Sequence, residues 1–400
     1  MNNVLSLFDG MSCFQLALQK IGIKPAKYYA SEIDKYAMKV TMANFPNTIQ
    51  LGDVRNLDAT QLDKIDIVAG GSPCQSFSFA GKRKGMSTID NIEITSLDQY
   101  LELKNNQFEF EGQSYLFWEY IRILKEVRKK NPNVLFLLEN VMMSKKWQKV
   151  ITQAIGINPI QINSSTLSAQ NRNRLYWTNI AAQPTGFFGD LVCTIPGPED
   201  KGILLKDILE KNVSEKYFLS ETSIKYLLKD TTKNYSDRLT FLNHRDNKKS
   251  TCITANHSKG VPYNMVTVHN TMKRSSKTGK GGTGHLSRND GKTYCLDTKQ
   301  SNVIEVKSGT LRTHNHGKGF REIKTGKGAA IPARAREDGS GQNVVLVAGN
   351  IRRLTPIECE RLQTVPDNYT NHVSDTQRYK MLGNGWTIDV IAYILNFINQ

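Results

Sequence analysis

The sequence predicts an α/β fold in which successive strands deliver polar turns to one edge of a parallel sheet. Short apolar runs of strand length occur at residues 4–8, 28–30, 65–69 and 134–138. Each run is followed by a turn with Gly or a charged residue, and helical apolar spacing separates the runs, as at residues 13–21 and 116–124. Open α/β sheets carry their functional groups at the carboxyl ends of the strands, so these turns are the expected site.

The first three strand ends have the features of a nucleotide pocket. Residues 9–12 form a glycine turn between the first strand and a helix, an arrangement that binds nucleoside-containing cofactors. Glu32 lies about twenty positions further on and can accept hydrogen bonds from ribose hydroxyls. Asp53, after a short third strand, can accept from an adenine amino group. Many α/β units share the first feature, and a surface Glu is an equal interpretation of Glu32 by itself.

The fourth strand, residues 65–69, runs into Gly-Gly-Ser-Pro-Cys-Gln, with Cys74 just past the strand end. The glycines and Pro73 stop the strand and fix a tight turn. A thiol attacks only as thiolate, from a rigid, partly exposed and electropositive setting. An isolated Cys is more often a small buried apolar residue, and the remaining signals decide for the nucleophile.

Residues 77–113 follow, rich in Gly, Lys and polar residues, with one short helical pattern at residues 97–104. Long connections without secondary structure in compact domains are commonly functional lids. We therefore expect a long mobile loop that closes over the site beside Cys74.

The fifth strand, residues 134–138, delivers Glu139 to the same edge as Cys74. Because the strand is apolar, we expect partial desolvation to raise the pKa of this carboxyl group, so that it can hold a proton at neutral pH. A helix N-cap acid is the alternative. Arg172 and Arg174 then alternate along a predicted strand, which puts both guanidinium groups on one side. Two such charges favour an anion, or a carbonyl oxygen that gains charge, over a plain surface edge.

Composition points to a polyanionic partner. The net charge is +16 and the pI is about 9.4, and residues 270–338 hold fifteen Lys/Arg against six Asp/Glu. A phosphate-contacting surface is the favoured interpretation over a solvated face. No apolar run reaches the length of a membrane span, and no secretion leader is visible. The six scattered cysteines form no C-x-x-C pair, so we expect no metal and a reducing, cytoplasmic setting.

Three motifs in this order resemble the cytosine-5 DNA methyltransferases of bacteria and phages: Pro-Cys-Gln at Cys74, Glu-Asn-Val at Glu139, and Gln-x-Arg-x-Arg ending at Arg174. Residues 353–363 resemble the family's Arg-x-x-Thr/His-Pro-x-Glu segment, and residues 382–386 its last cofactor-contacting turn. Several segments look most like the catalytic domains of vertebrate de novo methyltransferases. One departure is the first turn, Phe-Asp-Gly-Met-Ser-Cys, which lacks the second glycine of the usual Phe-x-Gly-x-Gly.

The resemblance implies a Rossmann-like methyltransferase domain at residues 1–182, which uses S-adenosylmethionine and releases S-adenosylhomocysteine. It implies a smaller β-rich target-recognition domain at residues 183–349, and a segment at 350–400 that completes the catalytic domain. The implied activity is that of a site-specific DNA (cytosine-5)-methyltransferase in a bacterial or phage-infected cell. A monomer is the default expectation for its oligomeric state.

The resemblance also implies roles for individual residues. Cys74 adds to carbon 6 of a flipped-out cytosine, and Glu139 holds or donates a proton at ring nitrogen 3. Arg174 binds the carbonyl oxygen of the base, and Arg172 supports Cys74 or a nearby phosphate. The implied cofactor pocket consists of Phe8, Gly10, Met11, Glu32, Ile33, Asp53, Val54, Pro73, Leu116, Asn384, Gly385 and Trp386.

Target recognition is expected in the second half, where residues 249–255, 292–298 and 307–313 form a weak repeat of short strands followed by basic turns. Such turns can reach base edges in the major groove. The expected DNA contacts are Gln75, Ser76, Lys82, Arg83, Lys259, Arg274, Arg288, Arg312, His314, His316, Lys318 and Arg321. A flexible linker or phosphate-only contacts are equal interpretations for any one residue of the second half.

Two other functions share part of this pattern with double-stranded DNA methylation. A related branch methylates cytosine in tRNA, but it carries a Cys-Phe-Thr tripeptide that this chain lacks. A DNA-binding regulator on an inactive scaffold needs a lost nucleophile or acid, whereas Cys74 and Glu139 are both present. The recognition sequence, a paired restriction endonuclease and a preference for hemimethylated DNA are not readable from the sequence.

Overall fold

The computed structural model describes residues 1–73, 86–185, 190–211, 213–217 and 352–398, and short strands between residues 268 and 344. Its centre is a seven-stranded sheet of order β3-β2-β1-β4-β5-β7-β6. The strands are β1 (Asn3–Leu7), β2 (Lys27–Ser31), β3 (Ile49–Gln50), β4 (Ile67–Gly70), β5 (Leu135–Val141), β6 (Ile160–Asn163) and β7 (Asn173–Thr178). Strands β1 to β5 are parallel, and β7 runs antiparallel between β5 and β6. The predicted α/β fold is confirmed.

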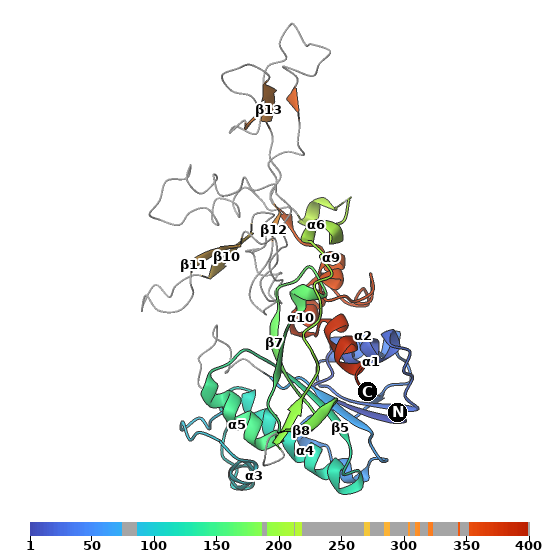
Figure 1. Ribbon diagram of the computed structural model, residues 1–400, viewed down its shortest axis with the longest axis vertical. Helices are drawn as coiled ribbons and strands as arrows, with labels where there is room; N and C mark the ends of the chain where they lie inside the picture. Colours follow the sequence, from blue (N-terminus) through green and yellow to red (C-terminus); the bar gives the residue numbers. More distant parts are fainter. Residues whose placement is uncertain are drawn as a thin grey trace.

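Helices cover both faces of this sheet (Figure 1). Helices α4 and α5 lie on one side, and α1 and α2 on the other. The helices of this part are α1 (Cys13–Lys20), α2 (Lys35–Asn44), α3 (Leu97–Asn105), α4 (Phe117–Lys130) and α5 (Lys145–Ile155). Strand order reverses between β1 and β4, and open α/β sheets bind ligands in the crevice outside such a switch point.

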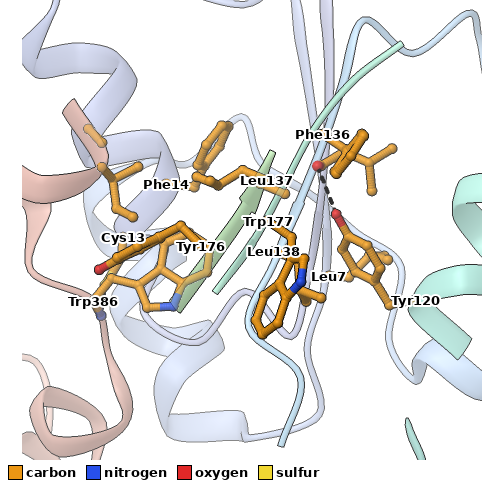
Figure 2. Close-up of a cluster of buried hydrophobic side chains, with 14 of the residues drawn as sticks. Leu7, Cys13, Phe14, Tyr120, Phe136, Leu137, Leu138, Tyr176, Trp177 and Trp386 are labelled. Carbon is orange, nitrogen blue, oxygen red and sulfur yellow. Dashed lines mark hydrogen bonds between the residues drawn. The ribbon is translucent and has the colours of Figure 1, made fainter. Parts of the chain in front are cut away.

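The sheet is buried on both faces, which is why its central strands are almost wholly apolar. Leu7, Leu137 and Leu138 are fully buried, and Figure 2 shows them packed among aromatic side chains from the strands and covering helices. The Tyr120 hydroxyl of α4 donates a hydrogen bond to the Val68 carbonyl of β4 at 3.4 Å, which fixes the helix on the sheet.

The C-terminal segment packs back onto the first helix. It contains α9 (Pro356–Leu362), α10 (Asp375–Asn384) and α11 (Ile388–Leu395). Val390, Ile391 and Ile394 of α11 are buried, and Lys20 of α1 forms an ion pair with Asp389. Figure 1 shows the C-terminus beside α1 and α2. The end of the chain is therefore part of the same core as its beginning.

The remaining described elements are short. Strands β8 (Ala182–Thr185) and β9 (Asp190–Cys193) form a hairpin, and α6 (Leu205–Ile208) follows. The 3-10 turns are η1 (Val54–Asn56), η2 (Ala59–Gln61), η3 (Ser114–Leu116), η4 (Ser164–Thr166) and η5 (Glu215–Tyr217). The short strands further on are β10 (Val268–Met272), β11 (Gly284–Arg288), β12 (Val303–Ile304), β13 (Gly309–Arg312), β14 (Gly319–Glu322), β15 (Asn343–Val344) and β16 (Arg352–Arg353).

The described strands of the second half form antiparallel pairs. Strand β13 falls within the third predicted repeat and pairs with β14 and β15. Among the expected DNA contacts, Arg288, Arg312 and Arg321 lie in β11, β13 and β14. Lys259, Arg274, His314, His316 and Lys318 lie outside the described residues, as do the first two repeats.

The prediction of one long mobile loop at residues 77–113 was wrong for its second part. Residues 86–113 fold onto the domain: Met86, Ile94 and Tyr100 are buried, and Ser87 bridges to Glu93. The apolar residues of this stretch are too widely spaced to read as a strand, yet they supply enough buried surface to fix it. The predicted helical piece is confirmed as α3.

No helix in the described ranges combines the length and apolar character that crossing a bilayer requires.

Glu119 is the buried charge that joins α3 to α4. It is fully buried and accepts hydrogen bonds from the Tyr100 hydroxyl, Lys104 Nζ at 2.6 Å and Arg122 Nε at 2.6 Å. Removing one partner of a buried ion pair typically costs 3–5 kcal/mol, because a charge is left uncompensated.

We therefore expect Glu119→Gln to lower the free energy of unfolding by about 3 kcal/mol, measured by urea denaturation. Glu126 shares Arg122 but is partly exposed, so the control Glu126→Gln should cost about 1 kcal/mol or less. Equal losses in both variants would contradict the assignment of Glu119 as the junction.

Candidate active site

The turn after β1 adopts an unusual backbone. Phe8, Gly10 and Ser12 all have left-handed conformations, with φ of 56°, 60° and 64°. Ser12 occupies the place where the usual Phe-x-Gly-x-Gly pattern has its second glycine. A non-glycine residue pays roughly 1–2 kcal/mol for this conformation, and Ser12 is fully buried with its Oγ donating to Gln15 Oε1 at 3.2 Å. The turn therefore keeps its shape although Ser12 replaces the second glycine, and the left-handed backbone of Ser12 has an energetic cost.

Glu32, at the end of β2, is oriented by the backbone. Its Oε2 accepts from Gly10 N at 2.8 Å, and its Oε1 accepts from the N–H groups of Ile33 and Asp34 at 2.8 and 2.7 Å. A carboxylate offers about four acceptor positions, so capacity for a ligand hydroxyl is left. Ile33 is 64% exposed beside it, an apolar surface that a flat ring would cover. These contacts disfavour the interpretation of Glu32 as an ordinary surface residue.

Asp53 has an ion-pair partner that the sequence did not indicate. Arg55 Nε lies 3.1 and 3.0 Å from the two carboxylate oxygens, and this guanidinium lowers the pKa of Asp53. Ser31 Oγ donates to the Gly52 carbonyl at 2.7 Å, which ties this turn to the end of β2. Val54 next to it is buried. Asp53 thus lies at the predicted edge, with part of its hydrogen-bonding capacity already used.

Asp9 is a further residue of the first turn, missed by sequence reasoning. It is buried and accepts a hydrogen bond from the Tyr28 hydroxyl at 2.7 Å. Burial raises the pKa of Asp9 to about 6; hydrogen bonds from Ser6, Tyr28 and Ser12 oppose the rise, and the charge of Glu32 adds to it. Its place in an otherwise ordinary Gly turn gave no signal of burial.

Glu139 lies within β5, opposite Tyr176 of β7, because the strand continues through Val141. The predicted end of this strand at residue 138 was therefore wrong, and the N-cap alternative is excluded. Glu139 Oε1 lies 2.9 Å from Arg174 Nε in an ion pair, and Oε2 accepts from Trp386 Nε1 at 3.1 Å. Both contacts hold the carboxylate in one orientation.

Arg172 and Arg174 have different partners among the described residues. Arg174 lies in β7 and faces Glu139, whereas Arg172 precedes the strand. The guanidinium of Arg172 donates to the carbonyls of Gly383 and Gly385 at 3.3 and 2.9 Å. Arg172 therefore fixes the C-terminal turn to the sheet. A shared anion site for the two guanidinium groups stays a prediction.

Asn140 anchors the turn that leads to Cys74. It is buried, and its Nδ2 lies 3.1 Å from Ser72 Oγ and 3.3 Å from the Ser72 carbonyl. Pro73 follows, half-buried. Because β4 pairs with β5 up to Gly70 and Leu138, this turn leaves the sheet beside Glu139. Five expected site residues of the next stretch lie outside the described residues: Cys74, Gln75, Ser76, Lys82 and Arg83.

The C-terminal turn meets the first turn, as a shared pocket requires. A Cβ on Gly385 would lie 3.0 Å from Met11 Cε. Trp386 packs edge-on against Phe14, with ring centroids 6.3 Å apart, and its backbone N–H donates to Cys13 Sγ at 3.4 Å (Figure 2). Asn384 is exposed on this turn, and Leu116 is half-buried at the start of α4.

Gln170, the first residue of the Gln-x-Arg-x-Arg motif, is fully buried. Within the described part of the chain, neither its amide nitrogen nor its amide oxygen has a hydrogen-bond partner. Buried polar groups are rarely left in this state. The described residues contain no cluster of three His, Cys, Asp or Glu side chains that could hold a metal ion.

Solved structures share this fold. The chain superposes on a methyltransferase of Entamoeba histolytica, EhMeth, with a TM-score of 0.53, 15% identity, and 100% and 98% of the two chains covered. A Dnmt2 of Spodoptera frugiperda gives 0.52, 19% identity and full coverage of both chains. At these identities the likeness establishes the methyltransferase fold alone.

Sequence comparison gives the family. Residues 2–97 and 102–400 match the C-5 cytosine-specific DNA methylases, and the chain belongs to this family. The orphan methyltransferase M.SPRI of Bacillus phage SPR is 29% identical, covering 98% of this chain and 96% of its own length. The type II methyltransferase M.HhaI of Haemophilus parahaemolyticus is 25% identical, with 98% and 92% covered. The resemblance inferred from the motifs is confirmed, and the protein is an enzyme of the DNA (cytosine-5-)-methyltransferase class.

Asp9 predicts a specific pH dependence of stability. Its pKa is raised in the folded state, so its contribution favours folding below the unfolded pKa near 4 and is lost as the pH rises through about 6. We expect Asp9→Asn to stabilise the protein by about 1 kcal/mol at pH 4.5 and about 3 kcal/mol at pH 7.5. Urea denaturation at both pH values measures this. The same difference at the two pH values would contradict the burial of an ionisable Asp9.

Proposed function

We propose that this enzyme transfers a methyl group from S-adenosylmethionine to carbon 5 of a flipped-out cytosine at a specific site in double-stranded DNA, through a covalent bond to Cys74. The observation that carries the proposal is the buried Glu139–Arg174 pair, 2.9 Å apart, beside the turn that leads to Cys74. A carboxylate and a guanidinium at this spacing match two neighbouring hydrogen-bonding groups of cytosine, ring nitrogen 3 and the carbonyl oxygen on carbon 2.

The chemistry of the base explains this match. Ring nitrogen 3 and the carbonyl oxygen on carbon 2 are adjacent, so groups that bind them must be adjacent as well. A proton that Glu139 places on nitrogen 3 of the base prevents negative charge from accumulating on the ring. Arg174 donates to the carbonyl oxygen, where charge also develops. Glu139 Oε1 makes an ion contact with Arg174 but accepts no aligned hydrogen bond within the described residues, which leaves it open to the base.

Cys74 is the nucleophile in this proposal. Its thiolate forms a bond to carbon 6, which turns carbon 5 into an enamine-like nucleophile. After carbon 5 has gained the methyl group it loses its proton, and the bond between sulfur and carbon 6 breaks. The described cysteines fit this task poorly: Cys13, Cys193 and Cys359 are buried, and burial raises the pKa of Cys13 to about 12.

The base has to leave the helix for this attack, because the thiolate approaches carbon 6 perpendicular to the ring. Flipping the nucleotide costs a few kcal/mol of stacking and pairing. The turn at Ser72 and Pro73 is held to β5 by Asn140, which gives the following residues a rigid starting point. We assign Gln75, Ser76, Lys82 and Arg83 to DNA contacts around the flipped base.

The first turn and its neighbours fit S-adenosylmethionine, which when bound supplies an electrophilic methyl group. Glu32 has capacity for ribose hydroxyls, and the exposed Ile33 offers an apolar surface for adenine. Asp53 would accept from the adenine amino group with the capacity that Arg55 leaves. The other residues assigned to this pocket are Phe8, Gly10, Met11, Val54, Pro73, Leu116, Asn384, Gly385 and Trp386.

Target recognition is assigned to residues 183–349, between the catalytic parts at 1–182 and 350–400. The support is the excess of positive charge in residues 270–338 and the short antiparallel strands there. Charge neutralises phosphates, while base edges supply sequence specificity. Arg274, Arg288, Arg312, Lys318 and Arg321 are the proposed contacts.

The relatives suggest two biological settings. Some carry the name type II methyltransferase and others orphan methyltransferase, and they come from bacteria and phages. We propose a monomer acting in the cytoplasm of such a cell, with a cognate restriction endonuclease as the partner to look for.

Methyl transfer tests the proposal. Tritiated S-adenosylmethionine is incubated with unmethylated DNA and with tRNA, using wild-type protein and Cys74→Ser. Label in DNA as 5-methylcytosine, lost in the variant, is the expected result, and bisulfite sequencing then gives the site. Label in tRNA alone would overturn the choice of substrate. DNA binding without any transfer would favour the regulator.

Glu139→Gln should lower kcat by about 10² to 10⁴, because the variant cannot deliver a proton to nitrogen 3. Glu93, an exposed carboxylate paired with Lys146, supplies the matched control. Glu93→Gln should keep the wild-type rate in the same steady-state assay. A Glu139→Gln variant with full activity would remove Glu139 from the mechanism.

A further inference from the structure

Trp386 contacts both the start of α1 and the Glu139 carboxylate. Its backbone N–H donates to Cys13 Sγ, and its ring packs on Phe14, both at the start of α1. On its other side the indole N–H donates to Glu139 Oε2 at 3.1 Å. The family resemblance accounts for Trp386 as a cofactor contact, but not for a bond to the carboxylate.

The hydrogen bond is enclosed by close packing. Trp386 is 8% exposed, and the Glu139 side chain is 10% exposed. A Cβ added to Gly71 would lie 2.8 Å from Trp386 Nε1 and 3.2 Å from Glu139 Oε2. Glycine at residue 71 is thus required by the space that the indole and the carboxylate occupy together. The hydrogen bond between Trp386 and Glu139 is therefore fixed by the packing around it.

We propose that Trp386 is a positioning residue for Glu139: its indole N–H fixes the direction of the carboxylate. The inference deepens the proposed function and rests on it. The indole supports one carboxylate oxygen, and the other is left for the base.

Other groups also act on the Glu139 side chain. Arg174 of β7 is its ion-pair partner, and Tyr176 lies opposite it in the strand register. The Cys13 thiol of α1 interacts electrostatically with Glu139, Arg172 and Asp9. Trp386→Phe leaves all of these in place and removes one donor, so its effect isolates the indole N–H.

A direct test uses the indole resonances of the full-length protein labelled with [15N]Trp. The chain has four tryptophans, and Trp386→Phe assigns the signal. We expect the Trp386 indole signal to move in Glu139→Gln, because the atom that accepts its hydrogen bond changes, and to keep its position in Glu93→Gln. A Trp386 signal that is the same in wild-type protein and in Glu139→Gln would overturn the inference.

Steady-state methylation of DNA supplies the functional readout. We expect Trp386→Phe to lower kcat about tenfold and to leave KM for DNA unchanged, because a misdirected carboxylate slows the chemical step. The control is Trp177→Phe, which removes an indole N–H of β7 that donates to Thr152 Oγ1 of α5 at 3.0 Å. The control should leave kcat unchanged.

The outcomes separate the inference from the proposed function. An unchanged kcat in Trp386→Phe, or a fall in kcat together with a matching rise in KM for DNA, would overturn the inference. An equal loss of kcat in Trp177→Phe would do the same. If the wild-type protein transfers no methyl group to DNA, the proposed function fails, while the indole signal still reports on the hydrogen bond.

Discussion

A carboxylate within an apolar strand depends on a charged partner, and the partner of Glu139 exists because β7 lies antiparallel beside β5. The register places Arg174 opposite Val141, two residue pairs along the strands from the pair of Glu139 and Tyr176. From there the guanidinium reaches the carboxylate at 2.9 Å. Without this strand the cost of burying Glu139 would be uncompensated. The antiparallel strand β7 therefore allows an acidic side chain, Glu139, to be buried near the end of β5.

The surrounding residues act as supports for this pair. Asn140 holds the turn at Ser72, Arg172 holds the carbonyls of Gly383 and Gly385, and Trp386 joins Glu139 to the start of α1. Segments from both ends of the chain thereby meet at one edge of the sheet. The contacts that close this edge are made by the C-terminal segment, which packs on α1.

The sequence was sufficient for the fold and for the family. Strand-length apolar runs, with Gly and acidic turns behind them, located β1, β2, β4 and β5, and three motifs singled out Glu139, Arg172 and Arg174. It was insufficient for partners across the sheet. The bonds from Arg172 to the carbonyls of Gly383 and Gly385 join residues more than 200 positions apart. The burial of Asp9 and the bond from Trp386 to Glu139 arise from tertiary packing that has no local signature. The folding of residues 86–113 was missed for the same reason.

The most direct test of the account is to trap the bond to the base. A DNA duplex with 5-fluorocytosine at the methylated position blocks the final elimination, because fluorine cannot leave carbon 5 as the proton does. Incubation with S-adenosylmethionine and mass spectrometry of the digested protein should place the adduct on Cys74 in wild-type protein, with much slower formation in Glu139→Gln. An adduct on another cysteine, or normal methylation of cytosine with no trapped complex, would contradict the account.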